Sequence, residues 1–185
     1  MTQFVDILGY DRIAALASAL PFVPKRERFI FVRHGETEGN RTKRYQLPHT
    51  PLNDTGEAQA AVAAKSLAST KIGKLVASPM ARAWRTASLI AHEHNMHPEV
   101  DGALSERFYV SLWDTPIEGA FDWNWDPDGC EPLATFVHRA AHSARHLTRH
   151  VARHERTGRF HRAAVSTNSP NTVRRASPKS AWVSA

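Results

Sequence analysis

Residues 29–35 read FIFVRHG, a continuous apolar run that stops abruptly at an arginine, a histidine and a glycine. A short apolar run rich in aromatic and β-branched residues is typical of a buried strand. A second short strand is predicted over 74–77, and helices are predicted over 54–68, 78–92 and 133–151. Strands that alternate with helices indicate an α/β fold with a mostly parallel central sheet. Ligands bind beyond the carboxyl ends of such strands, where His34 and Ser78 lie.

The three predicted helices each show an apolar side. The first has capping-box spacing at Asp54 and Glu57, and its apolar residues are Ala58, Ala61, Val62 and Leu67. The second is expected to begin at Ser78 as its cap, with Pro79 as its first residue; the inner residues expected are Trp84, Ala87, Ile90 and Ala91. The third has the clearest stripe, made of Leu133, Phe136, Val137, Ala140, Ala144, Leu147 and Val151.

Length and composition are those of one globular domain. The chain has 185 residues, of which 42% are hydrophobic and 23% charged. No apolar run approaches the roughly 18 residues that span a bilayer, and Asp6, Asp11 and Arg12 interrupt the region where an export signal would lie. Cys130 is the single cysteine, which excludes an intrachain disulfide. We therefore expect a cytoplasmic protein without a membrane partner, with residues 1–27 as an N-terminal extension.

Charge is distributed unevenly along the chain. Residues 1–136 carry a net charge of −3, whereas residues 137–185 hold ten Lys/Arg against the single Glu155. Such a split can mark a nucleic-acid or membrane-binding tail. Histidines recur every fourth residue at His138, His142, His146, His150 and His154, interleaved with Arg139, Arg145, Arg149 and Arg153. Because this series drifts by about 40° per member around a helix, we interpret it as a solvated basic face. Neither a metal ladder nor a nucleic-acid partner is expected.

Five segments carry motifs, in a fixed order along the chain. They are RHGETEGN at 33–40, PLNDTG at 51–56 (preceded by Gln46), ASPMARAWRTA at 77–87, LSERF at 104–108 and PDGCEPL at 127–133. Together they resemble the histidine phosphatase superfamily (phosphoglycerate mutase-like, branch 1), over about residues 28–160. The resemblance implies a three-layer sandwich, with helices on both sides of the sheet. It also implies phosphoryl transfer on a small phosphorylated substrate, with no cofactor and no metal.

The resemblance assigns a role to each of five residues. His34 would be the nucleophile that becomes a phosphohistidine, and Glu106 the acid and base. Arg33, Asn40 and Arg82 would bind the substrate phosphate. The residue types suit these roles: a neutral imidazole is a good nucleophile near neutral pH, a carboxyl group can protonate a leaving oxygen, and guanidinium groups match phosphate oxygens.

The chain departs from the family near its end. Family members place a second catalytic histidine after a late strand, where this sequence has Thr167 in the segment AAVSTN at 163–168. His161 comes before that strand and is expected at its wrong end. Two explanations remain open: a natural divergent member with a disordered tail, or a reading-frame shift near residues 160–170 that truncated or altered the C-terminal part. Losing one donor that stabilises developing charge typically costs about 10²–10³ in rate.

The leading prediction is a phosphatase acting on a small phosphomonoester, impaired by the missing histidine. Mutase-type phosphoryl transfer and an inactive, phospho-ligand-binding homologue are the alternatives. The catalytic domain is predicted over residues 28–168, followed by a disordered basic tail over 169–185. The irregular segment 107–130, which contains three tryptophans, is expected to line the substrate entrance.

Overall fold

A computed structural model describes residues 8–20, 29–119, 122–149 and 161–166. Within these ranges the strands are β1 (Phe29–Arg33), β2 (Ile72–Ala77), β3 (Glu99–Val100) and β4 (His161–Ser166). They form one sheet in the order β1-β4-β2-β3, in which every pairing is parallel. The last strand of the described chain therefore lies in the interior of the sheet, between β1 and β2.

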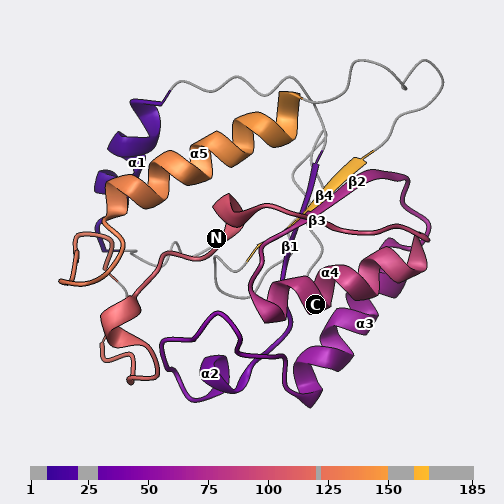
Figure 1. Cartoon of the computed structure of the whole chain (residues 1–185), viewed down its shortest axis with the longest axis horizontal. Coiled ribbons are helices and arrows are strands. Elements are labelled where there is room, and N and C mark those ends of the chain that lie inside the picture. Colours follow the sequence, from indigo (N-terminus) through magenta and orange to yellow (C-terminus); the bar gives the residue numbers. More distant parts are fainter. Residues whose placement is uncertain (1–7, 21–28, 120–121, 150–160, 167–185) are drawn as a thin grey trace, which may run out of the picture.

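Helices cover both sides of this sheet. They are α1 (Tyr10–Ser18), α2 (Glu38–Arg41), α3 (Asp54–Leu67), α4 (Ala81–Glu93) and α5 (Leu133–Arg149), with short 3₁₀ turns η1 (Gly102–Leu104) and η2 (Val110–Leu112). Figure 1 shows the sheet between the pair α3 and α4 and the pair α1 and α5. The predicted α/β fold with a parallel central sheet is confirmed. No helix in the described ranges is long and apolar enough to cross a membrane.

The register of the sheet aligns the carboxyl ends of three strands. Ser166 at the end of β4 pairs with Arg33 at the end of β1, and Val165 pairs with Ala77 at the end of β2. His161 pairs with Ile72, at the opposite, amino-terminal end of these strands. The prediction that His161 lies at the wrong end of its strand is confirmed. Thr167, the tail and the proposed change of the C-terminal part lie outside the described residues.

The main core lies between the sheet and α3 and α4, and it corrects the predicted faces of both helices. α3 buries Ala60, Ala63, Ala64 and Leu67, not Ala58, Ala61 and Val62. Trp84 is 38% exposed, whereas Ala83 and Ala87 are completely buried. Both helices turn their small residues inward, because α3 packs against α4 and α4 also contacts β2 and β4. Ile90 and Ala91 are buried as predicted.

Two helix starts also differ from prediction. Asn53, not Asp54, caps α3, and its side chain accepts a hydrogen bond from Gly56 N at 2.8 Å. α4 begins at Ala81, after the extended residue Met80. Ser78 is completely buried and accepts a hydrogen bond from Met80 N, at 3.3 Å. Ser78 thus stabilises the turn that leads into α4 and is not the cap of the helix itself.

A second apolar cluster joins α1 to α5. Its buried residues, Leu133, Phe136 and Val137, come from the predicted stripe, and Ile13, Leu16, Leu20 and Trp123 pack against them. Trp123 stacks on Phe136 with 5.9 Å between ring centroids. The apolar stripe of α5 therefore faces α1, within the segment predicted as an N-terminal extension.

Candidate active site

His34 follows β1 directly and is 6% exposed. Its Nδ1 lies 2.6 Å from the carbonyl oxygen of Gly35. A carbonyl can only accept, so this contact requires the hydrogen on Nδ1 and leaves the lone pair on Nε2. The strand end thus presents an imidazole in the tautomer that a nucleophile at Nε2 requires.

The surroundings of His34 keep this imidazole uncharged. The pKa of His34 is lowered from 6.5 to about 3 by burial of the ring, by the charge of Arg82 and, to a smaller extent, by the charge of Arg33, while the hydrogen bond to Gly35 opposes the shift. The ring is therefore neutral at every pH well above 3. A neutral ring keeps its Nε2 lone pair available, as nucleophilic attack demands.

This low pKa predicts a specific pH dependence of stability. Between the folded value of about 3 and the ordinary value of 6.5, the unfolded chain takes up a proton at His34 that the folded chain does not. The free energy of unfolding must therefore fall as pH decreases through this window. We expect wild type to lose about 2 kcal/mol more than His34→Gln between pH 7 and pH 5. Urea titrations of both proteins would measure this, and equal losses would contradict the prediction.

The loop that carries His34 is packed against the start of α3. Asn53 N donates to the carbonyl oxygen of Glu36 at 3.1 Å, and Asn53 Nδ2 donates to Glu36 Oε1 at 2.8 Å. Glu36 N donates to Gln59 Oε1 at 2.8 Å. Gly35 and Gly56 allow the two backbones to touch, since a Cβ on either would overlap the carbonyl oxygen of the other segment. These contacts fix the position of His34.

Arg82 supplies the buried charge beside His34. It lies in the first turn of α4 and is completely buried. Its Nη1 donates to the carbonyl oxygen of Leu47 at 3.1 Å, and its Nη2 lies 2.7 Å from Glu106 Oε2. Its Nε is buried without a hydrogen-bond partner among the described residues. Arg82 therefore pairs with the predicted acid and base, and its charge also acts on His34.

Glu106 belongs to a segment that α5 holds in place. Arg139 donates to the carbonyl oxygens of Ser105 (2.7 Å) and Glu106 (2.8 Å). Arg139 is itself paired with Glu131 at 2.6 Å, and Glu131 also accepts a hydrogen bond from Phe108 N at 3.2 Å. The backbone is thus fixed on both sides of Glu106. Arg139 was predicted to lie on a solvated face; this is wrong, because its long side chain reaches inward to carbonyls and a carboxylate.

Arg33 and Asn40 occupy different surroundings. Burial lowers the pKa of Arg33. The charge of Glu106 raises this pKa and the charge of Arg82 lowers it, so Arg33 lies in the same electrostatic cluster as these two residues. Asn40 takes part in the capping box of α2: its Oδ1 accepts a hydrogen bond from Thr37 N at 3.3 Å, and its N donates to Thr37 Oγ1 at 3.1 Å. The structure therefore brings His34, Arg33, Arg82 and Glu106 together and places the Asn40 carbonyl in a helix cap.

A pocket opens beside Arg82 and Glu106. It is also lined by Tyr45, Gln46, Met80, Arg107, Phe108, Tyr109 and Trp113. Of the three tryptophans in segment 107–130, Trp113 is a lining residue. Trp123 stacks on Phe136, and Trp125 stacks on Tyr109 with 6.5 Å between ring centroids. The segment thus contributes its first part to the pocket and its later part to the packing behind it.

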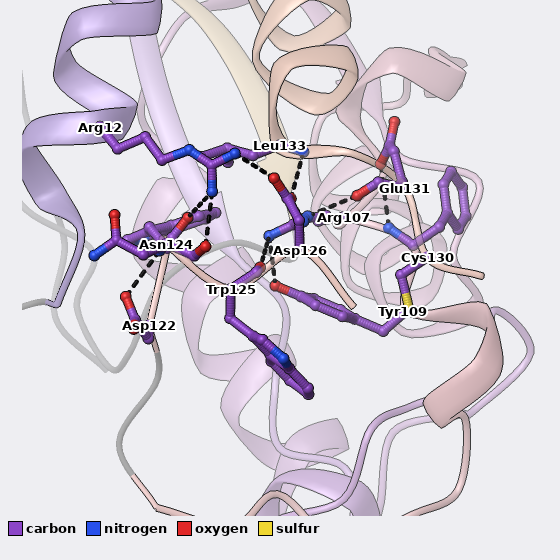
Figure 2. Close-up of polar contacts among 12 residues, drawn as sticks. Arg12, Arg107, Tyr109, Asp122, Asn124, Trp125, Asp126, Cys130, Glu131 and Leu133 are labelled. Atoms are coloured by element: carbon purple, nitrogen blue, oxygen red, sulfur yellow. Dashed lines mark hydrogen bonds and ion pairs between the residues drawn. The ribbon is translucent and has the colours of Figure 1, made fainter. Parts of the chain in front are cut away.

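The sequence analysis missed the polar network behind this pocket (Figure 2). Arg107 is 3% exposed; it is ion-paired with Asp126 and donates to the carbonyl oxygen of Glu131 at 2.8 Å. Asp126 also accepts hydrogen bonds from Arg12 and from Leu133 N, the first residue of α5. The available signal was the position of Arg107 directly after Glu106 and of Asp126 directly before the segment 127–133.

The outer side of α5 carries the histidine series. His138, His142 and His146 are exposed, as expected for a solvated face, and His150 and His154 lie outside the described residues. In the described part of the chain, no three His, Cys, Asp or Glu side chains are grouped so that they could hold a metal ion.

Known proteins match this chain over most of the described domain. The family model of the histidine phosphatase superfamily (branch 1) matches residues 29–166 and ends directly before Thr167. An uncharacterized protein of Mycobacterium tuberculosis (strain ATCC 25618 / H37Rv) is 40% identical over 102 residues, which are 54% of this chain and 50% of the relative. Fructose-2,6-bisphosphatase TIGAR B of Danio rerio is 43% identical over 94 residues, 47% of this chain and 36% of that protein.

A solved structure agrees with this match at the level of the fold. The native structure of a mycobacterial glucosyl-3-phosphoglycerate phosphatase superposes with a TM-score of 0.62 at 24% identity, covering 75% of this chain and 72% of that chain. This chain spans half the length of the mycobacterial sequence relative. The family model, however, covers well over half of the present chain, and the resemblance carried by the five segments is confirmed. The chain belongs to the histidine phosphatase superfamily, branch 1.

Proposed function

We propose that this chain hydrolyses a small phosphomonoester through a phosphohistidine at His34. One observation carries the proposal: a buried, neutral imidazole lies at a strand end beside Arg82, which is bound to the carboxylate of Glu106. A phosphate monoester needs fixed cations and an aligned nucleophile more than it needs covalent chemistry from several groups. Arg82 and Arg33 would supply the cations.

The first step transfers the phosphoryl group to the protein. His34 Nε2 attacks phosphorus, the bond from phosphorus to the ester oxygen breaks, and the leaving oxygen takes a proton from Glu106. The second step reverses these roles. Glu106 takes a proton from water, the water oxygen attacks phosphorus, and the phosphorus–nitrogen bond breaks to release phosphate and a neutral His34. The proton returns to Glu106 within one cycle.

Turnover is expected to be slow. Thr167 stands where the family has its second histidine, and the loss of one such donor costs about 10²–10³ in rate. The same observation favours one second candidate, a homologue that binds phosphorylated ligands without turning them over. The two candidates differ in one measurable species, which is the covalent phosphoenzyme.

The test is to trap that species on the full chain. The protein is incubated with ³²P-labelled phenyl phosphate, quenched in alkali, digested and sequenced by mass spectrometry. We expect an alkali-stable, acid-labile adduct on the peptide that contains His34, together with release of phenol. Tight binding of orthovanadate without any adduct would support the binding-only candidate. An adduct on a different residue would refute the proposed mechanism.

A further inference from the structure

Arg139 reaches from α5 to the segment that carries Glu106. Its Nη1 donates to the carbonyl oxygens of Ala103 (3.1 Å) and Ser105 (2.7 Å), and its Nη2 donates to the carbonyl oxygen of Glu106 (2.8 Å). The remaining N–H groups donate to the carboxylate of Glu131, from Nε at 2.6 Å and from Nη2 at 2.7 Å. A guanidinium has five N–H donors, and in Arg139 each of them has an acceptor. Its partners therefore fix the position of this side chain.

Two aromatic rings and Glu131 complete this arrangement. The central guanidinium carbon of Arg139 lies 5.2 Å from the ring centroid of Phe108 and 5.0 Å from that of Phe136, and a cation over an aromatic face is attracted to it. Glu131 binds Phe108 as well: its N donates to the Phe108 carbonyl oxygen at 2.7 Å, and its Oε2 accepts a hydrogen bond from Phe108 N at 3.2 Å. Arg139 and Glu131 thus form a unit that holds residues 103–108 against α5.

Glu106 depends on this unit because its own backbone belongs to no helix or strand. The turn η1 ends at Leu104, and residues 105–109 form no regular element. Carbonyl oxygens that are not used by a helix or a sheet need another partner. The carbonyl oxygen of Glu106 finds it in Arg139, 33 positions away in the chain. The place of Glu106 in the site is therefore set by a distant side chain.

Protonation of Glu106 increases this dependence. The carboxylate is held by Arg82, whose Nη2 lies 2.7 Å from Oε2. In the proposed first step Glu106 carries a proton, which it gives to the ester oxygen as the phosphorus–oxygen bond breaks. A protonated carboxyl group has lost the charge that strengthens its hydrogen bond to Arg82. The hydrogen bond from Arg139 goes to the backbone of Glu106 and does not depend on that charge.

We propose that Arg139 is a positioning residue for this proton transfer: it keeps the carboxyl group of Glu106 within reach of the leaving oxygen while the pairing with Arg82 is weakened. This role rests on the proposed function, because it assumes that Glu106 is the acid. Arg139 is not among the described residues that line the pocket, so it acts through Glu106 and not on the substrate. Misplacing a reacting group by about 1 Å can cost about 10²-fold in rate.

The test compares two esters that differ in their need for the proton. Phenyl phosphate releases a strongly basic phenolate and p-nitrophenyl phosphate a weakly basic nitrophenolate, so acid catalysis accelerates the first much more. Arg139→Met should lower kcat/KM about 30-fold to 100-fold for phenyl phosphate, and no more than about threefold for p-nitrophenyl phosphate. Hydrolysis of the phosphoenzyme does not enter, because kcat/KM covers only the steps up to release of the phenol. Equal losses for the two esters would overturn the inference.

The ratio of the two kcat/KM values separates positioning from stability. A smaller folded fraction lowers both values by the same factor and leaves their ratio unchanged. Arg85→Met is the matched control, because Arg85 is an exposed arginine of α4 that pairs with Glu57 of α3 at 2.8 Å. It should keep the wild-type ratio within about twofold.

A conservative variant covers the case in which Arg139→Met fails to fold. Arg139→Lys keeps a positive charge beside Glu131 but lacks the planar fork that reaches several acceptors at once. Its ratio of phenyl to p-nitrophenyl phosphate turnover should fall at least about fivefold. An unchanged ratio in this variant would count against the inference.

A double-mutant cycle tests whether Arg139 acts through Glu106. Glu106→Gln keeps the size of the side chain but cannot supply the proton. In that background, Arg139→Met should change the ratio by less than about twofold, because the group that it positions has already lost its chemistry. If Arg139→Met lowers the ratio as much in Glu106→Gln as in the wild type, Arg139 acts on another group and the inference is wrong.

Failure of the proposed function looks different. The wild-type chain would then release neither phenol nor p-nitrophenol, and no adduct would form at His34; this result would refute the positioning role as well. Adduct formation at His34 together with an unchanged ester ratio in Arg139→Met refutes the positioning role alone.

Discussion

Replacing His34 by glutamine is expected to abolish phosphoryl transfer, with a loss of about 10⁴-fold or more in kcat/KM. No other group can take the place of Nε2: the cluster around it consists of Arg33 and Arg82, which are cations, and Glu106, which is bound to Arg82 at 2.7 Å. An amide cannot form a phosphoenzyme that hydrolyses in the same way. Release of p-nitrophenol, corrected for the rate without enzyme, measures the loss.

The fold should survive this substitution near neutral pH. Glutamine is close to histidine in size, and the ring donates a hydrogen bond to the neighbouring Gly35, whose loss costs about 1 kcal/mol. His138→Gln is the matched control, because His138 is exposed on α5. It should retain wild-type turnover. Activity above 1% of wild type in His34→Gln would rule out His34 as the nucleophile.

Gly56→Ala is expected to destabilise the protein severely, although alanine is the better helix former. In an ordinary helix this exchange stabilises by about 1 kcal/mol. Gly56, however, lies in the first turn of α3, where a Cβ would overlap the Glu36 carbonyl oxygen and lie 2.7 Å from its nitrogen. Backbone atoms cannot swing aside as a side chain can. We expect a loss of at least about 2–3 kcal/mol in the free energy of unfolding, measured by urea titration.

Gly102→Ala provides the control for this prediction. Gly102 begins the turn η1, and a Cβ there would meet nothing within 4 Å. The free energy of unfolding should change by less than about 0.5 kcal/mol. If both variants unfolded at the same urea concentration, the close approach of residues 35–36 to α3 would be wrong. Lower phosphatase activity in Gly56→Ala is also expected, since the same contact positions His34.

The sequence predicted the features that depend on residues close together in the chain. The apolar run before Arg33 indicated a buried strand, and the strand forms over Phe29–Arg33. The third helix was predicted from the spacing of its apolar residues, and α5 begins at the predicted Leu133. The residues of the electrostatic cluster were predicted from the short motif segments that contain them. In each case the signal lies within a few residues of the feature that it predicts.

Helix faces were harder to predict, because hydrophobicity does not measure available space. Trp84 is the largest apolar residue of α4, but the core holds Ala83 and Ala87 at 0% exposure, since α4 lies close to its neighbours. On α3, Val62 is 62% exposed for the same reason. The size of the side chain determined which of these residues are buried. The size that fits can be judged only when the neighbouring element is known.

The network around Asp126 could not be predicted from the sequence, for a different reason. Its members Arg12 and Asp126 are 114 positions apart in the chain. Arg139 was predicted to lie on a solvated face and Arg107 was given no role of its own. The burial of both side chains depends on carboxylates and carbonyls that other segments bring to them. No periodicity or local spacing encodes such pairs. They become visible only when the tertiary structure places α1 against α5.

The sheet order has a consequence for how the chain is made. β4 lies between β1 and β2, and its residues leave the ribosome after those of every other described element. Until residues 161–166 are available, β1 has no described partner strand, and only β2 and β3 can pair. From the synthesis of β2 until that of β4, the nascent chain must therefore leave the middle of its sheet unfilled, with unpaired backbone N–H and C=O groups of β1 and β2 accessible to chaperones or to other chains.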